Sequence, residues 1–144
     1  MRLYLDNCCF NRPFDDQTQL KISLESQAKL AVQDMILKGK HSLIWSYILE
    51  YENMNNPFDL RKDSIGKWKD LAEKNILAND EIIKLAEALV KKGLKPKDAL
   101  HIACASYADC DYFITTDAGI LKKHIEVIKT INPIDFISET EVDQ

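Results

Sequence analysis

Three acidic residues stand where the sequence pattern predicts strands to end or helices to begin, and a fourth stands within a predicted helix. Asp6 and Asp117 each come just after a short apolar run. Asp98 lies in the first turn of a predicted helix, and Glu52 lies further along another. Taken alone, each acid is also typical of a turn, a helix cap or a solvated surface. Together they could meet at one edge of a sheet, where such a group can do chemistry.

Carboxylates held close together repel one another and raise each other's pKa unless a cation neutralises them. Their hard oxygen atoms select Mg²⁺ or Mn²⁺ rather than zinc. A divalent ion bound in such a cluster promotes the in-line hydrolysis of phosphodiester bonds. The four acids therefore predict metal-dependent phosphodiester chemistry, provided that the fold brings them together.

The elements that must position these acids are short apolar runs that alternate with longer amphipathic segments. Strands are predicted over residues 2–5, 42–45 and 112–115, with shorter ones near Ile76-Leu77 and over 126–131. Helices are predicted over 18–38, 47–53, 59–72, 80–92 and 96–108, with shorter ones over 117–123 and 133–138. Strands separated by helices pair in parallel and carry helices on both faces, so we expect an α/β fold. Active sites in such sheets gather beyond the carboxyl ends of the strands, where Asp6 and Asp117 fall.

Capping residues and apolar spacing define these helices further. Ser46 and Asp80 are predicted N-caps, and Pro96 is the predicted first residue of its helix. The expected inner faces are Leu20, Leu24, Ala28, Ala31 and Met35 in the helix over 18–38, and Leu60, Trp68 and Leu71 in the helix over 59–72.

The chain's 144 residues fit one hydrophobic core, so residues 1–144 are predicted to form a single domain. No apolar run approaches the roughly 20 residues of a membrane span, and no signal-peptide pattern is present, so we expect a cytoplasmic protein. The four cysteines lack the Cys-x-x-Cys spacing of zinc sites, which favours free thiols. The net charge of −4 is not the basic footprint of a nucleic-acid-binding protein. However, a bound cation would reverse the field at an acidic site.

Four short stretches carry the four acids in order along nearly the whole chain. They are Tyr4-Leu5-Asp6-Asn7; the stretch from Ser46 to Glu52, in which the serine precedes the acid by six positions; Lys97-Asp98 at the head of an alanine-rich helix; and Phe113-Ile114-Thr115-Thr116-Asp117. This ordered set resembles the motifs of the PIN-domain family. Many single-domain bacterial members of that family are VapC-like toxins.

The resemblance implies a three-layer α/β/α sandwich around a short parallel sheet and a Mg²⁺- or Mn²⁺-dependent endoribonuclease. The resemblance also implies that the catalytic residues are Asp6, Glu52, Asp98 and Asp117. The three aspartates would hold the metal, and Glu52 would bind metal or activate the attacking water. RNA would be the substrate, and the protein would be the toxin of a toxin–antitoxin pair with a cognate antitoxin as partner. A homodimer is also possible, and no membrane partner is expected.

Two polar neighbours of the acids are candidates for positioning or substrate contact. Asn7 could orient a ligand carboxylate or contact phosphate, or it could be a turn residue. Thr116 could position a water or a phosphate, or it could cap the following helix. His101 lies three residues after Asp98, where it could be a packed core histidine or a proton shuttle. Arg12, Arg61 and Lys62 could contact phosphate, although solvated surface charge explains them as well.

The chain also departs from the family pattern. Asn7 stands where many members carry Thr or Ser, and Ala118 stands where many have a further Asp, so the number of metals stays open. Glu50 is the alternative to Glu52 if the helix register is shifted. The segment over residues 10–16 lies outside the general motif, and we expect it to form a loop beside the site.

Two other functions are compatible with the same residues. A non-catalytic PIN-like module could bind RNA or a protein partner, although an intact set of four acids argues against it. A structure-specific nuclease acting on DNA is a further alternative. Such enzymes usually carry additional acids and long insertions, which this chain lacks.

Overall fold

The computed structural model describes residues 1–142 as a five-stranded parallel sheet with the strand order β3-β2-β1-β4-β5. The strands are β1 (Arg2–Leu5), β2 (Ser42–Ser46), β3 (Lys74–Ile76), β4 (Tyr112–Ile114) and β5 (Lys129–Ile131). The helices are α1 (Asn7–Asn11), α2 (Leu20–Leu37), α3 (Tyr47–Met54), α4 (Asp59–Leu71), α5 (Asp80–Lys91), α6 (Pro96–Tyr107), α7 (Ala118–Leu121) and α8 (Pro133–Val142). A short 3-10 helix, η1 (Arg12–Phe14), follows α1 directly.

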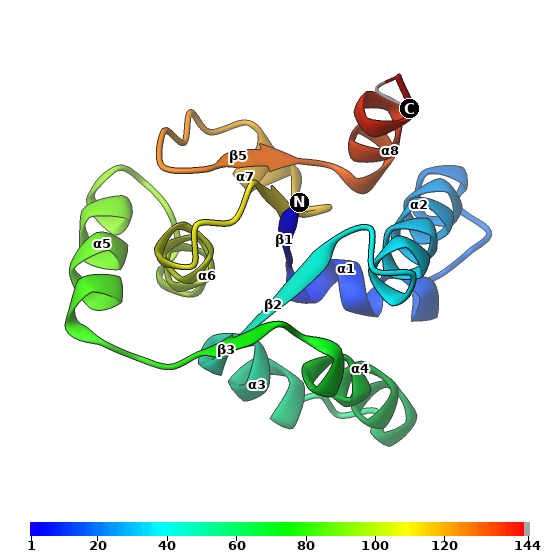
Figure 1. The fold of residues 1–144 in the computed structure, drawn as a ribbon, viewed down its shortest axis with the longest axis horizontal. Coiled ribbons are helices and arrows are strands. Elements are labelled where there is room, and N and C mark those ends of the chain that lie inside the picture. The colour runs from blue at the N-terminus through cyan, green and yellow to red at the C-terminus, as the bar shows by residue number, and fades with distance from the viewer. Residues whose placement is uncertain (143–144) are drawn as a thin grey trace.

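Helices cover both faces of the sheet (Figure 1). α5 packs against α6 on one side, and α2 packs against α8 on the other. The central strands β1, β2 and β4 are therefore buried on both faces, which explains their continuous apolar sequences. Leu3, Leu5, Ile44, Trp45 and Phe113 have no exposed surface. This arrangement confirms the predicted three-layer α/β/α fold around a parallel sheet.

The register of β1 and β4 brings two segments that are distant in sequence to the same edge. Leu5 pairs with Ile114, so the residues that follow them, Asp6 and Thr115, come next to each other at the carboxyl end of the sheet. Ser46, the last residue of β2, reaches the same edge beside β1. The start of α3 and the carboxyl ends of two strands therefore surround one region.

The inner face of α2 differs from the prediction. Leu20 and Leu24 are 73% and 44% exposed, whereas Glu25, Lys29 and Gln33 are buried. Both sets repeat at helical spacing, and the buried face is the one whose Glu25 contacts Arg12 and Asn132. Lys29 lies over the ring of Phe10 at 5.6 Å from its centroid, and burial lowers its pKa to about 8. The buried apolar residues of α2 are Val32 and Ile36.

Smaller differences affect α4, α5 and α8. Trp68 of α4 packs against the core as predicted, but Leu60 and Leu71 are exposed and Ile65 is the buried residue instead. Asn79, rather than Asp80, caps α5, because its side chain accepts a hydrogen bond from the Ile82 amide. α8 extends to Val142, well beyond the predicted turn over 133–138, and the segment over 10–16 is mostly helical rather than a loop. Within residues 1–142, no helix is long and apolar enough to cross a membrane.

Candidate active site

Asp6 lies at the carboxyl end of β1 and caps α1. Its Oδ1 accepts a hydrogen bond from the amide of Asn7, the first residue of the helix, at 2.8 Å. Its Oδ2 accepts one from the Thr115 hydroxyl, also at 2.8 Å. Only 6% of Asp6 is exposed. Both carboxylate oxygens are thus held by neighbours, which fixes the direction in which the negative charge faces.

Thr115 connects Asp6 to Asp117. The hydroxyl that donates to Asp6 also accepts a hydrogen bond from the Asp117 amide at 3.0 Å. Asp117 in turn caps α7, with its Oδ1 accepting from the Gly119 amide at 2.7 Å and the Ile120 amide at 3.3 Å. A fully buried threonine therefore positions the acids that follow the two central strands.

Asp98 lies in the first turn of α6, which begins at Pro96. The pKa of Asp98 is raised, first because the side chain is partly buried and then because of the negative charges of Asp6 and Asp117. His101 and Lys95 oppose this rise to a smaller extent. The negative charges of Asp6 and Asp117, which follow β1 and β4, thus act on Asp98 of α6 at the carboxyl edge of the sheet.

Glu52 of α3 meets this group through His101 of α6. His101 Nε2 lies 2.5 Å from Glu52 Oε1 and 4.0 Å from Asp6 Oδ1. Burial lowers the pKa of His101, but its hydrogen bond to Glu52 and the charges of Asp6, Glu52 and Asp98 outweigh burial and raise it overall. For Glu52, burial raises the pKa, but the contacts with His101, the charge of Lys97 and the Asn7 side chain lower it overall. A protonated His101 beside an ionised Glu52 is the state favoured by this pair.

The other side of the His101 ring continues into the core. Its Nδ1 lies 2.6 Å from the Tyr4 hydroxyl, which lies 2.6 Å from the Ser46 hydroxyl. Ser46 also caps α3, as predicted, by accepting from the Leu49 amide. His101 is 1% exposed, so it is a packed core histidine that also reaches the acids.

Glu50 lies away from this group. Its Oε2 accepts a hydrogen bond from the Trp45 indole at 2.9 Å and lies 3.6 Å from Lys69 Nζ. In the same helix, Glu52 faces His101. The geometry therefore places Glu52, and not Glu50, beside Asp6 and Asp98.

The two other candidate residues, Asn7 and Thr116, occupy different environments. Asn7 starts α1, and its side chain lies in the wall of a pocket together with Glu52. Thr116 is buried, and its hydroxyl accepts a hydrogen bond from Arg12 Nη2 at 2.8 Å. The N-cap of α7 is Asp117, so Thr116 does not have that role.

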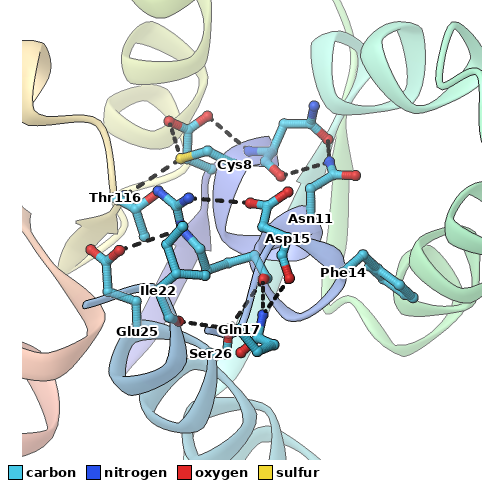
Figure 2. A network of polar contacts seen from close by, with 12 residues as sticks. Cys8, Asn11, Phe14, Asp15, Gln17, Ile22, Glu25, Ser26 and Thr116 are labelled. Atoms are coloured by element: carbon cyan, nitrogen blue, oxygen red, sulfur yellow. Dashed lines mark hydrogen bonds and ion pairs between the residues drawn. The ribbon is translucent and has the colours of Figure 1, made fainter. Parts of the chain in front are cut away.

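The Arg12 side chain joins Thr116 to Asp15 and to Glu25 of α2 (Figure 2). Figure 2 shows Asp15, Glu25 and Thr116 around one guanidinium group. Its Nη1 donates to Asp15 Oδ2 at 3.1 Å, and its Nε lies 3.4 Å from Glu25 Oε1 in a charge contact without hydrogen-bond geometry. Asn132 donates to the other oxygen of Glu25 at 2.5 Å. Arg12 is therefore a structural link behind the acids rather than a solvated surface charge.

The donor set fits a hard divalent cation in chemistry and in charge. The three aspartates supply the oxygen ligands that Mg²⁺ prefers, and burial together with the charges of Asp6 and Asp117 raises the pKa of Asp98. Among residues 1–142, however, no three His, Cys, Asp or Glu side chains are already arranged to hold a metal. The four cysteines are free, and Cys8 contacts both Asp6 and Thr115 at 3.4 Å.

Two residues of the site, Thr115 and Tyr4, were not selected by sequence reasoning. Both stand in the motif stretches, one at the end of β4 and the other within β1. A hydroxyl group in an otherwise apolar buried strand was the available signal for Tyr4, because buried Tyr hydroxyls normally find hydrogen-bond partners.

The fold is similar to that of a solved structure. Neither a family model nor a curated protein matches the sequence. Among solved structures, a chain of VapBC2 from Rickettsia felis, in a complex bound to a DNA fragment from their promoter, matches with a TM-score of 0.58 at 13% identity. The match covers 92% of this chain and 98% of that chain. At this identity the likeness concerns the fold, which is PIN-like.

Proposed function

We propose that this protein is a Mg²⁺- or Mn²⁺-dependent endoribonuclease that hydrolyses phosphodiester bonds of RNA. The observation that carries the proposal is the convergence of the acids in space. The Thr115 hydroxyl donates to Asp6 and accepts from the Asp117 amide, and His101 Nε2 lies 2.5 Å from Glu52 and 4.0 Å from Asp6. Burial, and then the charges of Asp6 and Asp117, raise the pKa of Asp98 beside them. The PIN-like fold, shared with a chain of VapBC2, adds support.

The three aspartates would hold the cation, which when bound would activate water and neutralise the charge that develops on the phosphate. Thr115 keeps Asp6 and Asp117 in fixed orientations through its hydroxyl. Glu52 has a lowered pKa and stays ionised, so its carboxylate can accept a hydrogen bond from the attacking water and orient it. His101 holds Glu52 Oε1 and thereby leaves the other oxygen for that contact.

As a biological role, we propose the toxin of a toxin–antitoxin pair, acting on RNA in the cytoplasm and neutralised by a cognate antitoxin protein. The support is the fold shared with a chain of a complex named VapBC2. Induced expression of the wild-type chain should then arrest growth of a bacterial host, and the Asp98→Asn variant should not. Equal growth with both chains would argue against a toxin.

A non-catalytic PIN-like module that binds RNA or protein is the second candidate. It is favoured by two observations: no three side chains within residues 1–142 are already arranged around a metal position, and Ala118-Gly119 follows Asp117 where a further acid would strengthen metal binding. Such a module would bind its partner without any dependence on Mg²⁺ or Mn²⁺.

Cleavage of mixed single-stranded RNA separates the two candidates. The purified chain would be incubated with Mg²⁺, with Mn²⁺ or with EDTA, beside the Asp98→Asn variant. The ribonuclease proposal expects fragments that require both the ion and Asp98. Binding of RNA with no cleavage under either ion would support the module instead.

A further inference from the structure

Beside the acids lies a polar pocket with a volume of about 350 Å³. Its walls come from the start of α1, the end of α3, the loop that follows α3, α4 and the start of α6. The lining residues include Asn7, Asn11, Tyr51, Glu52, Asn56, Arg61 and Lys97. We propose that this pocket binds one nucleotide of single-stranded RNA next to the bond that is cut, an inference that rests on the proposed ribonuclease function.

The position of the pocket follows from the chain itself. Three of the four candidate acids have a direct sequence neighbour in its wall: Asn7 follows Asp6, Tyr51 precedes Glu52, and Lys97 precedes Asp98. Glu52 is itself part of the wall. A nucleotide in the pocket would therefore place an adjoining phosphate beside the acids.

Amide side chains form the part of the wall that can recognise a base. Asn11 donates to the Asn7 carbonyl oxygen at 3.0 Å, and Asn56 donates to Asn11 Oδ1 at 3.2 Å. Asn56 Oδ1 also accepts from the Phe58 amide, which holds the loop in place. Amide groups offer both donors and acceptors, the combination that pairs with the edges of unstacked bases. These hydrogen bonds fix the amides in advance of binding.

Cations over exposed aromatic rings form the rest of the pocket. Lys97 Nζ lies 5.6 Å from the centre of the Tyr51 ring, and the Arg61 guanidinium lies 4.5 Å from the centre of the Phe58 ring. Tyr51 and Phe58 are each 55% exposed. Bases of single-stranded RNA stack on such rings, and adjacent cations contact the phosphates. Arg61 also contacts Asp15 Oδ1 at 3.7 Å and donates to the Phe14 carbonyl oxygen at 2.7 Å, so Lys97 is the cation better placed to contact a phosphate.

The test compares pocket variants with matched controls for binding of a labelled random single-stranded RNA, measured by fluorescence anisotropy. All proteins carry Asp98→Asn so that the RNA stays intact. Tyr51→Ala is compared with Tyr107→Ala. Tyr107 is an exposed tyrosine at the end of α6 and lies outside the pocket. Lys97→Ala is compared with Lys84→Ala, which is exposed on α5. Tyr51→Phe keeps the ring.

We expect Tyr51→Ala to raise the Kd roughly tenfold, as the loss of one base-stacking ring does, and Tyr51→Phe to restore most of it. Lys97→Ala should raise the Kd and reduce its dependence on salt, because a phosphate contact is lost. The two controls should stay within about twofold of the parent, as expected for exposed residues outside an interface. Circular dichroism spectra and melting curves check that each variant is folded.

The possible results separate this inference from the proposed function. If the wild-type chain cuts RNA but Tyr51→Ala and Lys97→Ala bind it as the controls do, the pocket is not a nucleotide site and the ribonuclease stands. If the variants lose binding but the wild-type chain does not cut, the pocket binds RNA and the catalytic proposal fails. If the Asp98→Asn parent does not bind RNA and the wild-type chain does not cut it, both are wrong.

Discussion

His101 Nε2 lies 2.5 Å from Glu52 Oε1, and this contact joins α6 to α3 at the carboxyl edge of the sheet. The histidine is almost completely buried, and its other nitrogen contacts Tyr4. The carboxylates of Glu52 and Asp6 stabilise the protonated form of this buried imidazole. The contact with His101 therefore orients the Glu52 side chain. Because His101 changes its charge with pH, the contact also makes the stability of the fold depend on pH.

Replacing His101 by Gln should lower the free energy of unfolding by about 1–3 kcal/mol, the usual cost when a buried hydrogen-bonded group loses its partner. Because folding raises the pKa of His101, its charge contributes stability fully below the unfolded value of about 6.5. That contribution is lost as the pH rises through the folded pKa. Folding lowers the pKa of Glu52, so its contribution is lost only as the pH falls through that lowered value, well below this range.

Urea denaturation of wild type and His101→Gln, at several pH values from 6 upward and without metal, measures the difference in their free energies of unfolding. It should be largest at pH 6 and shrink as the pH rises. A difference that stays constant or grows over this range would show that His101 is not held in its protonated form.

Mg²⁺ or Mn²⁺ should raise the melting temperature of the wild-type chain, because an ion bound only by the folded state stabilises it. Asp98→Asn should melt roughly 2–4 °C higher than wild type without metal, because burial and the charges of Asp6 and Asp117 both disfavour the ionised carboxylate that it removes. The same variant should lose most of the response to the ion. Differential scanning fluorimetry measures both effects.

The matched control for Asp98→Asn is Asp70→Asn, an exposed acid of α4. It should respond to Mg²⁺ as the wild-type chain does. Equal stabilisation of wild type and Asp98→Asn by the ion would contradict a metal site that includes Asp98.

Thr115→Val should remove the hydroxyl between Asp6 and Asp117 while keeping the shape of the side chain. We expect a loss of about 1–3 kcal/mol in stability, because the Asp117 amide loses its acceptor. Activity should fall about 10- to 100-fold, as is typical when a residue that orients metal ligands is changed. Thr115→Ser keeps the hydroxyl and should recover most of the activity; a serine variant as inactive as the valine variant would disprove this role.

Arg12→Met should destabilise the fold by roughly 3 kcal/mol, because Glu25 is 1% exposed and would be left with Asn132 as its polar partner. Combining Arg12→Met with Glu25→Gln should cost less than the two single changes together. A double-mutant cycle in urea should therefore give a coupling within about 0.5–3 kcal/mol. Strict additivity would mean that the charge contact does not contribute to stability.

Strand ends were predictable from sequence because buried parallel strands have uninterrupted apolar runs. The run before Asp6 and the run before Thr115 both end at the edge where the acids lie. The Ser46 cap sets the start of α3 and thus the direction of Glu52, six residues later. Local rules of this kind do not depend on residues that are distant in sequence.

Other features depended on such distant residues. Choosing Thr115 over Thr116 as the link between the acids requires the pairing of Leu5 with Ile114, which no local pattern reveals. The buried face of α2 likewise depends on Arg12 and Asn132, whose contacts with Glu25 make a polar side chain tolerable inside. For that reason its leucines, at the same helical spacing, were wrongly expected to face the core.

The decisive measurement for a metal-dependent ribonuclease centred on Asp98 is RNA cleavage as a function of Mg²⁺ concentration. Wild type, Asp98→Asn and Asp70→Asn would be measured side by side on single-stranded RNA. We expect wild type and Asp70→Asn to cut at rates that rise with the ion and vanish in EDTA, while Asp98→Asn does not cut. Cleavage by Asp98→Asn at the wild-type rate, or cleavage that persists in EDTA, would contradict this expectation.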